Sequence, residues 1–138
     1  MSNLLDELRE VVVDLVCDHK LRITRIAYFP ERFGNALIEL SSPNMTILFL
    51  RDRGEIFVDV SNAQGESFPL EAVLASIRIT CSMRGRPPEI AAIVRDNFAV
   101  IEDAVNHRLE ELRAECSRRR SELICKFGRE RPADSSRH

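Results

Sequence analysis

The chain has 138 residues, of which 44% are hydrophobic and 30% charged, a composition that excludes wholesale disorder and is typical of one globular domain. Its formal net charge is only −2, from 20 basic and 22 acidic residues, which argues against a dedicated nucleic-acid binder. The apolar runs are far shorter than the roughly 20 residues that span a bilayer, and the N-terminus lacks the layout of a secretion signal, so we expect a cytoplasmic protein.

The first predicted element is an amphipathic helix over residues 3–18. Its apolar residues recur at three- and four-residue steps, and acidic residues lie near its beginning, where they favour the helix dipole. A strand is predicted over residues 21–29. Its apolar residues change parity near Arg25, so we predict a β-bulge at that position.

Three further strands are predicted between residues 33 and 60, where apolar runs are joined by short, turn-rich connections. The third strand of the chain, beginning at Met45, is apolar on both parities, so we expect it to be central and covered on both faces. The tripeptide Asp52-Arg53-Gly54 predicts a short hairpin in which Gly54 takes a positive φ. Together the four strands predict an antiparallel meander.

Two helices are predicted after the sheet, a short one over residues 69–77 and a long one from about Pro88 to Phe127. A helix of that length would extend on the order of 60 Å at 1.5 Å per residue, whereas a strand is about 20 Å long. We therefore expect its C-terminal half to project and to support dimerisation or partner docking. The alternative is a break near Asn106 and an ordinary two-helix cover.

These elements predict an α+β fold in which both later helices pack on one face of the sheet. We expect one domain over residues 1–128 and a disordered tail over residues 129–138, since Gly128 is a natural helix terminator.

The sequence contains no recognisable catalytic or metal-binding motif. The four cysteines are widely separated and the three histidines lie at spacings unsuited to zinc, so we expect reduced structural thiols, no metal and no cofactor. Nucleophile–base motifs such as Gly-x-Ser-x-Gly are also absent. We therefore expect a protein that is not an enzyme. The residues considered are Cys17, Cys81, Cys116, Cys125, His19, His107 and His138.

Candidate protein-interaction residues occur in the charged hairpin and the long helix. Asp52 and Gly54 are explained by turn chemistry, whereas Arg53 has no expected turn role and is the better contact candidate. Apolar residues in the later part of the helix would be wasteful on a segment that projects from a monomer. The candidates are Arg53, Glu55 and Asp59 in the hairpin and Leu109, Leu112 and Leu123 in the helix.

A basic run formed by Arg118, Arg119 and Arg120 is the candidate contact for nucleic acid, because each arginine can neutralise a phosphate. Cations near a helix C-terminus also interact favourably with the helix dipole and need no ligand. Interleaved glutamates and the absence of nearby aromatic residues favour this second interpretation.

The strings FGNALIEL and ILFLRDRGEIFVDV, followed by F-x-L-E-x-V-L at residues 68–74, resemble a pattern in small bacterial proteins of uncharacterised families. Some of these proteins are encoded beside toxins or phage-defence effectors and act as immunity or accessory proteins. The resemblance covers residues 33–77, excludes the basic C-terminal helix and implies no catalytic residue. The helix–sheet–helix order is also similar to small secretion-chaperone folds, which bind partner chains as dimers.

Our leading hypothesis is a non-enzymatic protein-binding module, an immunity or accessory subunit of a bacterial toxin or phage-defence system. Its expected partner is a toxin, effector or complex subunit, with homodimerisation through the C-terminal helix. The alternative is a nucleic-acid-binding accessory factor that uses the basic C-terminal helix.

Overall fold

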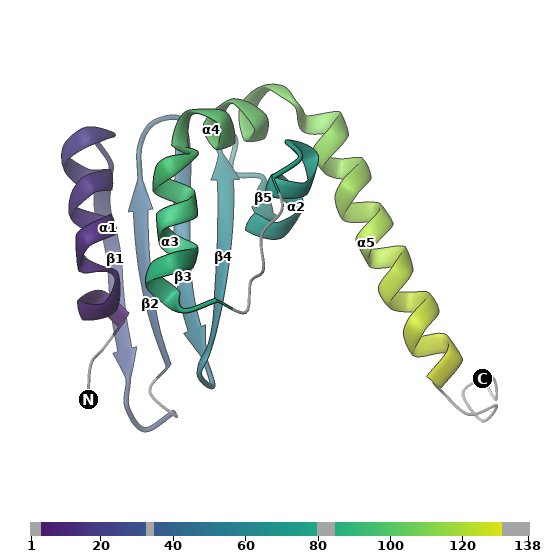
Figure 1. Cartoon of the computed structure of the whole chain (residues 1–138), viewed down its shortest axis with the longest axis horizontal. Helices are drawn as coiled ribbons and strands as arrows, with labels where there is room; N and C mark the ends of the chain where they lie inside the picture. The colour runs from purple at the N-terminus through teal and green to yellow at the C-terminus, as the bar shows by residue number, and fades with distance from the viewer. Residues whose placement is uncertain (1–3, 33–34, 80–84, 131–138) are drawn as a thin grey trace.

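The computed structural model describes residues 4–32, 35–79 and 85–130, with side chains described as far as residue 121. It confirms the predicted α+β fold, in which a helix precedes an antiparallel sheet and further helices follow it (Figure 1). In chain order the elements are α1 (Leu4–Asp18), β1 (Arg22–Phe29), β2 (Asn35–Ser41), β3 (Met45–Asp52), β4 (Glu55–Asn62), β5 (Ser67–Pro69), α2 (Leu70–Ser76), α3 (Pro87–Asp96), α4 (Phe98–His107) and α5 (Leu109–Glu130).

The sheet has the strand order β1-β2-β3-β4-β5, and every neighbouring pair is antiparallel. The predicted meander is therefore confirmed, with a fifth strand added at its end. This strand, β5, is three residues long and pairs with residues 59–61 of β4. The predicted bulge is also confirmed, because the pairing of β1 with β2 shifts register between Ile23 and Arg25.

The two faces of the sheet differ sharply in burial. In β2, β4 and most of β3 buried residues alternate strictly with half-buried or exposed ones, as expected when helices cover one face only. Helices α1, α3 and α4 lie on the same side of the sheet (Figure 1). The strand residues of the resulting core are Ala36, Ile38, Leu40, Met45, Ile47, Phe49, Ile56, Val58, Val60 and Phe68.

The expectation that β3 is covered on both faces was wrong. Ile47 and Phe49 are fully buried beneath the helices, but Leu48 and Leu50 are only half-buried. They lie on the opposite face, which no helix of the described chain covers. We call this side of the sheet the uncovered face.

The predicted long C-terminal helix is divided into α3, α4 and α5, with breaks at Asn97 and Arg108. At the first break the backbone N–H and the side-chain Nδ2 of Asn97 both donate to the Ile93 carbonyl (3.1 and 2.9 Å), and Asn97 departs from helical geometry with φ −119° and ψ 23°. The three- and four-residue spacing of apolar residues continues through both breaks, because each helix buries its own apolar face against the core. The chain thus turns across the end of the sheet instead of projecting as one rod of 40 residues.

Helix α5 is the longest, with 22 residues, or about 33 Å at 1.5 Å per residue. Its first turns pack against α2 and α4, and its later part leads away from the sheet (Figure 1). The helix continues through Gly128 to Glu130, whereas most of the predicted tail, residues 131–138, lies outside the described residues. No helix in the described part of the chain is both long and apolar enough to cross a membrane.

Candidate interaction surfaces

The hairpin between β3 and β4 is a two-residue turn. Arg53 (φ 55°) and Gly54 (φ 84°) both adopt left-handed backbone conformations, and Asp52 pairs with Glu55 to close the hairpin. This is the geometry of a type I′ turn. Arg53 therefore has a structural role in the turn that we had not expected.

Asn35, at the start of β2, holds this turn in place. Its Oδ1 accepts the backbone N–H of Arg53 (2.9 Å) and its Nδ2 donates to the carboxylate of Asp52 (3.1 Å). These contacts fix the backbone of the hairpin relative to the sheet. The backbone at the tip of the hairpin is consequently held in one conformation before any partner binds.

An apolar row crosses the uncovered face. The strand registers place Ala27 opposite Leu37, Leu37 opposite Leu50, and Leu50 opposite Phe57, so one apolar residue from each of β1 to β4 contributes. Phe57 ends the row with 44% of its surface exposed. A continuous apolar row of this kind is unusual on the solvated side of an antiparallel sheet.

A charged row lies next to the apolar row. Arg25 pairs with Glu39 across β1 and β2 (3.6 Å), and Leu48 lies between Glu39 and Asp59 in the strand register. Partial burial raises the pKa of the Asp59 carboxyl above its ordinary value. The uncovered face therefore carries both signs of charge beside its apolar row.

Hydroxyl groups form the third row of this face. The Thr24 hydroxyl donates to the Glu39 carboxylate (2.9 Å), and the hydroxyls of Ser41 and Thr46 hydrogen-bond across β2 and β3 (3.0 Å). A further pair, Ser61 and Ser67, joins β4 to β5 (3.0 Å). Along the strands of the uncovered face, the row of hydrogen-bonded hydroxyls is therefore followed by the charged row, then by the apolar row, and last by the hairpin.

The structure brings two predicted contact residues, Glu55 and Asp59, to the same face as Phe57, since the three alternate along β4. Arg53 lies at the adjoining tip. The sequence interpretation missed Leu37, Leu50 and Phe57. The signal was present in β4, where an aromatic residue stands between two acids on the parity that does not enter the core.

The predicted contacts on the C-terminal helix are distributed differently. Leu112 is fully buried and Leu109 is half-buried against the core, so both anchor α5 and Leu112 is unavailable to a partner. Of the two, Leu109 keeps part of its surface exposed, so its role as a contact residue stays a prediction. Leu123 lies among the residues whose side chains are not described.

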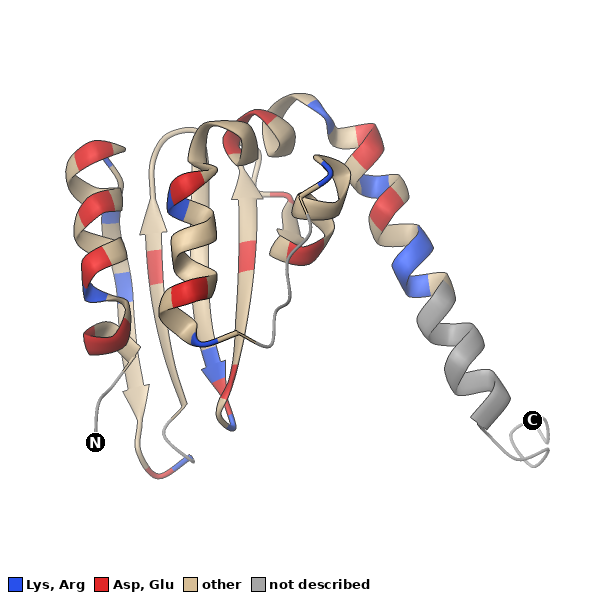
Figure 2. Ribbon diagram, viewed as in Figure 1, with Lys and Arg blue, Asp and Glu red and all other residues tan. Residues whose placement is uncertain are grey.

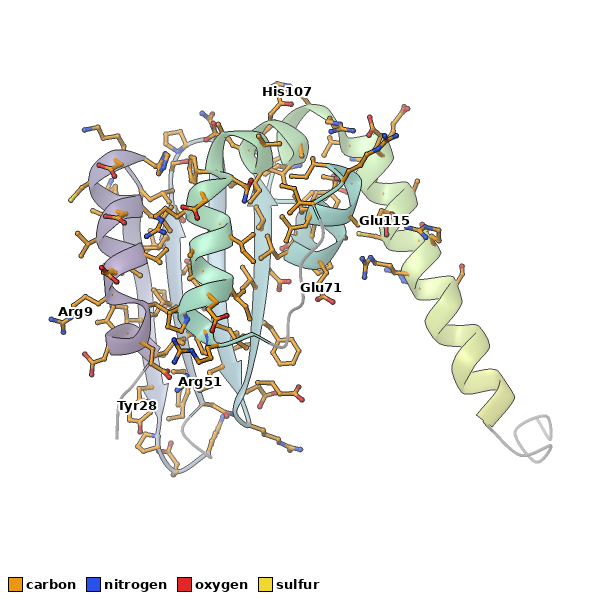
Figure 3. All side chains as sticks on the ribbon, viewed as in Figure 1. Arg9, Tyr28, Arg51, Glu71, His107 and Glu115 are labelled. Carbon is orange, nitrogen blue, oxygen red and sulfur yellow. The ribbon has the colours of Figure 1, made fainter. Side chains whose placement is uncertain are left out.

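Ion pairs also fix α5 to the body of the protein. Arg113 donates to both carboxylate oxygens of Glu66, with Nε–Oε2 and Nη2–Oε1 distances of 2.9 and 2.6 Å. These hydrogen bonds lower the pKa of Glu66. Farther along, Nη2 of Arg119 donates to the Glu71 carbonyl in α2 (3.4 Å), where the two helices lie side by side (Figure 3).

The basic run is partly neutralised by a glutamate one turn earlier. Arg118 and Arg119 both bond to the carboxylate of Glu115, whose pKa is lowered chiefly by the hydrogen bond from Arg118. Arg120 is exposed. Basic and acidic residues consequently alternate along the described part of α5 instead of forming a uniformly basic surface (Figure 2).

A polar hollow of about 520 Å³ lies where α4 meets two strand-connecting loops. Asn106 lines this hollow and joins α4 to both loops, because its side chain accepts a hydrogen bond from the Ala63 N–H (3.1 Å) and donates one to the Asn44 carbonyl (2.9 Å). Among the described side chains, no group of three or more His, Cys, Asp or Glu residues could hold a metal ion. Burial raises the pKa of the Cys116 thiol, which lowers the fraction present as the reactive thiolate at neutral pH.

No family model matches the sequence, and comparisons with curated proteins and with solved structures found no match. The surfaces described above therefore carry the functional argument.

Proposed function

We propose that this chain is a non-enzymatic protein-binding module that receives its partner on the uncovered face of the sheet. The observation that carries the proposal is the apolar row on that face, ending in the half-exposed ring of Phe57. Strands with apolar residues on both parities are normally buried on both sides. Since the described chain covers only one side, a partner that covers the other would account for Leu37 and Leu50.

The chemistry of the face favours a protein partner. Protein interfaces combine an apolar centre, often with an aromatic anchor, with a polar rim that sets orientation. Here the apolar row supplies the centre, and Glu55, Asp59 and the Arg25–Glu39 pair supply charged groups beside it. The mixed signs fit a partner surface with both acidic and basic groups.

The proposed partner is a toxin, effector or complex subunit, with this chain acting as its immunity protein or accessory subunit. This finer proposal rests on the resemblance over residues 33–77, which include β2, β3 and β4, three of the strands that form the uncovered face. Nucleic-acid binding has no comparable support, since Arg118 and Arg119 share Glu115.

A capture experiment with nuclease-treated lysate of the organism that encodes the chain tests this proposal. The immobilised wild-type chain should retain a specific protein, and Phe57→Asp should abolish retention because it places a charge at the most exposed end of the apolar row. Val100→Asp is the matched control, because Val100 is 49% exposed on α4, on the other side of the sheet, and it should leave retention unchanged.

The captured protein is then expressed alone and with this chain. An immunity role predicts that growth inhibition by the partner is relieved by the wild-type chain and persists with Phe57→Asp. Equal retention by wild type and Phe57→Asp would refute the uncovered face as the binding site. Retention that is seen in an untreated lysate and is lost after nuclease treatment would favour the nucleic-acid alternative.

A further inference from the structure

Exposed apolar side chains are concentrated at one edge of the molecule. Among the residues whose side chains are described, six large hydrophobic residues have substantial exposure, and four of them lie on α1 or β1: Val13 (51%), Ile23 (45%), Ile26 (50%) and Tyr28 (45%). The other two, on β4 and α4, belong to different surfaces. A cluster of this kind marks an interaction surface more strongly than single exposed residues do.

The backbone of β1 adds a second feature to this edge. The strand is eight residues long and, within residues 4–32, 35–79 and 85–130, pairs only with β2, so its outer side presents N–H and C=O groups that can serve as a template for another strand. The opposite edge of the sheet differs. There β5 has only three residues and packs against α2.

The three strongly exposed apolar residues of β1, Ile23, Ile26 and Tyr28, face the same side of the sheet as the helices. Ile26 pairs with Ile38 and Tyr28 with Ala36, and both partners belong to the core. Helix α1 packs mainly on α3 and β2, so it leaves this strip of β1 half-exposed. The strip and the free strand edge are therefore contiguous.

The outer flank of α1 borders the strip. Glu7 and Asp14 form ion pairs with Arg51 and Arg95, which places the acidic side of the helix toward β3 and α3. The spacing of Leu5, Arg9, Val13 and Val16 puts them on the other flank. Arg9 extends outward there, and Tyr28 lies toward the far end of β1 (Figure 3).

We propose that β1 pairs antiparallel with β1 of a second copy of this chain, producing a two-fold dimer with one continuous sheet. The bulge near Arg25 bends the first part of the strand away from a regular ladder, and Pro30 cannot donate to the ladder. The pairing is thus confined to residues 25–29. The apolar strips of the two copies meet between their α1 helices.

The sequence of β1 selects the register. Opposed residues in an antiparallel pair share a face, so a two-fold axis at Arg25 would place two guanidinium groups opposite each other, which is unfavourable. An axis at Ala27 instead places Ile26 of each copy opposite Tyr28 of the other copy, which gives two such pairs. Aromatic and β-branched residues form favourable cross-strand pairs, and Arg25 then lies opposite Phe29, with no like charges opposed.

A second copy is a better occupant than an unrelated strand because the segment complements itself in this register. The pairing is also closed, since the same edge is used by both copies. The opposite edge at β5 is short and flanked by α2, which prevents the sheet from growing into a filament. The dimer would join two uncovered faces, but it does not depend on the proposed partner.

Light scattering on the purified full chain tests the dimer. We expect a mass about twice the 15.8 kDa of the chain, and Ile26→Arg should halve it by placing a charge in each strip. Val100→Arg, at nearly the same exposure (49% against 50%), should remain dimeric. Circular dichroism and thermal melting establish that both variants are folded.

A disulfide measurement tests the register. With the axis at Ala27, the two Ala27 Cα atoms lie about 4.5–5.5 Å apart, within the range that a disulfide bridges. In a Cys17→Ser background, Ala27→Cys should give a dimer band on a non-reducing gel, and Val100→Cys should give none. A monomer at all concentrations would overturn the proposal. So would a dimer unaffected by Ile26→Arg, which would point to α5 as the interface.

Discussion

Leu40 and Leu37 lie three positions apart on β2, yet they occupy very different surroundings. Leu40 is fully buried beneath the helices, whereas Leu37 is half-buried on the uncovered face. The same strands therefore contribute to a packed core on one side of the sheet. On the other side they carry an apolar row that no described helix covers. The difference separates residues needed for folding from residues available for binding.

Matched alanine substitutions give the largest expected contrast between the two faces. Leu40→Ala should lower the free energy of unfolding by about 3 kcal/mol, because it leaves a cavity in a packed core. Leu37→Ala should cost about 1 kcal/mol, as for a partly solvated site. Urea unfolding of both variants measures the difference. Equal losses would show that the uncovered face is buried in the free protein.

A substitution in the hairpin separates two effects on the uncovered face, namely backbone strain and the loss of a contact surface. Gly54→Ala should destabilise the chain by about 1 kcal/mol, because φ is +84° there and a β-carbon strains the turn without a clash. Partner capture should be unchanged in the folded protein. Loss of capture in a fully folded variant would assign the binding site to the hairpin tip.

The pH dependence of Asp59 tests the environment of the uncovered face. Its folded-state pKa is raised by partial burial, so the unfolded chain ionises more readily and stability falls as pH rises through that pKa. Asp59→Asn should raise Tm at neutral pH and have little effect in acid, where the carboxyl is protonated in both states. Thermal melts across this range measure the effect. A constant difference at all pH values would exclude ionisation as the cause.

Glu66, away from the centre of the uncovered face, should show the opposite sign. Its pKa is lowered by Arg113, so its stabilising contribution is present above the ordinary glutamate pKa and is lost as pH falls through the folded value. Glu66→Gln should lower Tm slightly at neutral pH, with the difference vanishing in acid. Glu71→Gln, which keeps the backbone carbonyl that Arg119 uses, is the control. Persistence of the Glu66→Gln deficit in acid would contradict this ion-pair explanation.

The local parts of the fold could be read from sequence, because alternation in β2 and β4 and the parity change near Arg25 are signals within a few residues. The break at Asn97 could not, since the apolar spacing continues through it, whereas the break at Arg108 lies close to the one near Asn106 that we gave as the alternative. Strand β5 was missed because a strand of three residues that ends in Pro69 is too short to show an alternation of apolar and polar residues. The uncovered face was missed because leucines on both parities of β3 predict two covered faces, and sequence does not say whether the cover belongs to the same chain.

The meander order has a kinetic consequence. Every strand of the sheet pairs with its neighbour in the chain, so the loops that must close are short and their entropic cost is low. The distant contact is that of α1 with α3, where Asp14 and Arg95 are 81 residues apart. We therefore expect the hairpins to form early and the docking of α1 to come late in folding. Until that step, the core-facing side of β2 lacks its cover from α1, which makes the order of synthesis and docking relevant to aggregation.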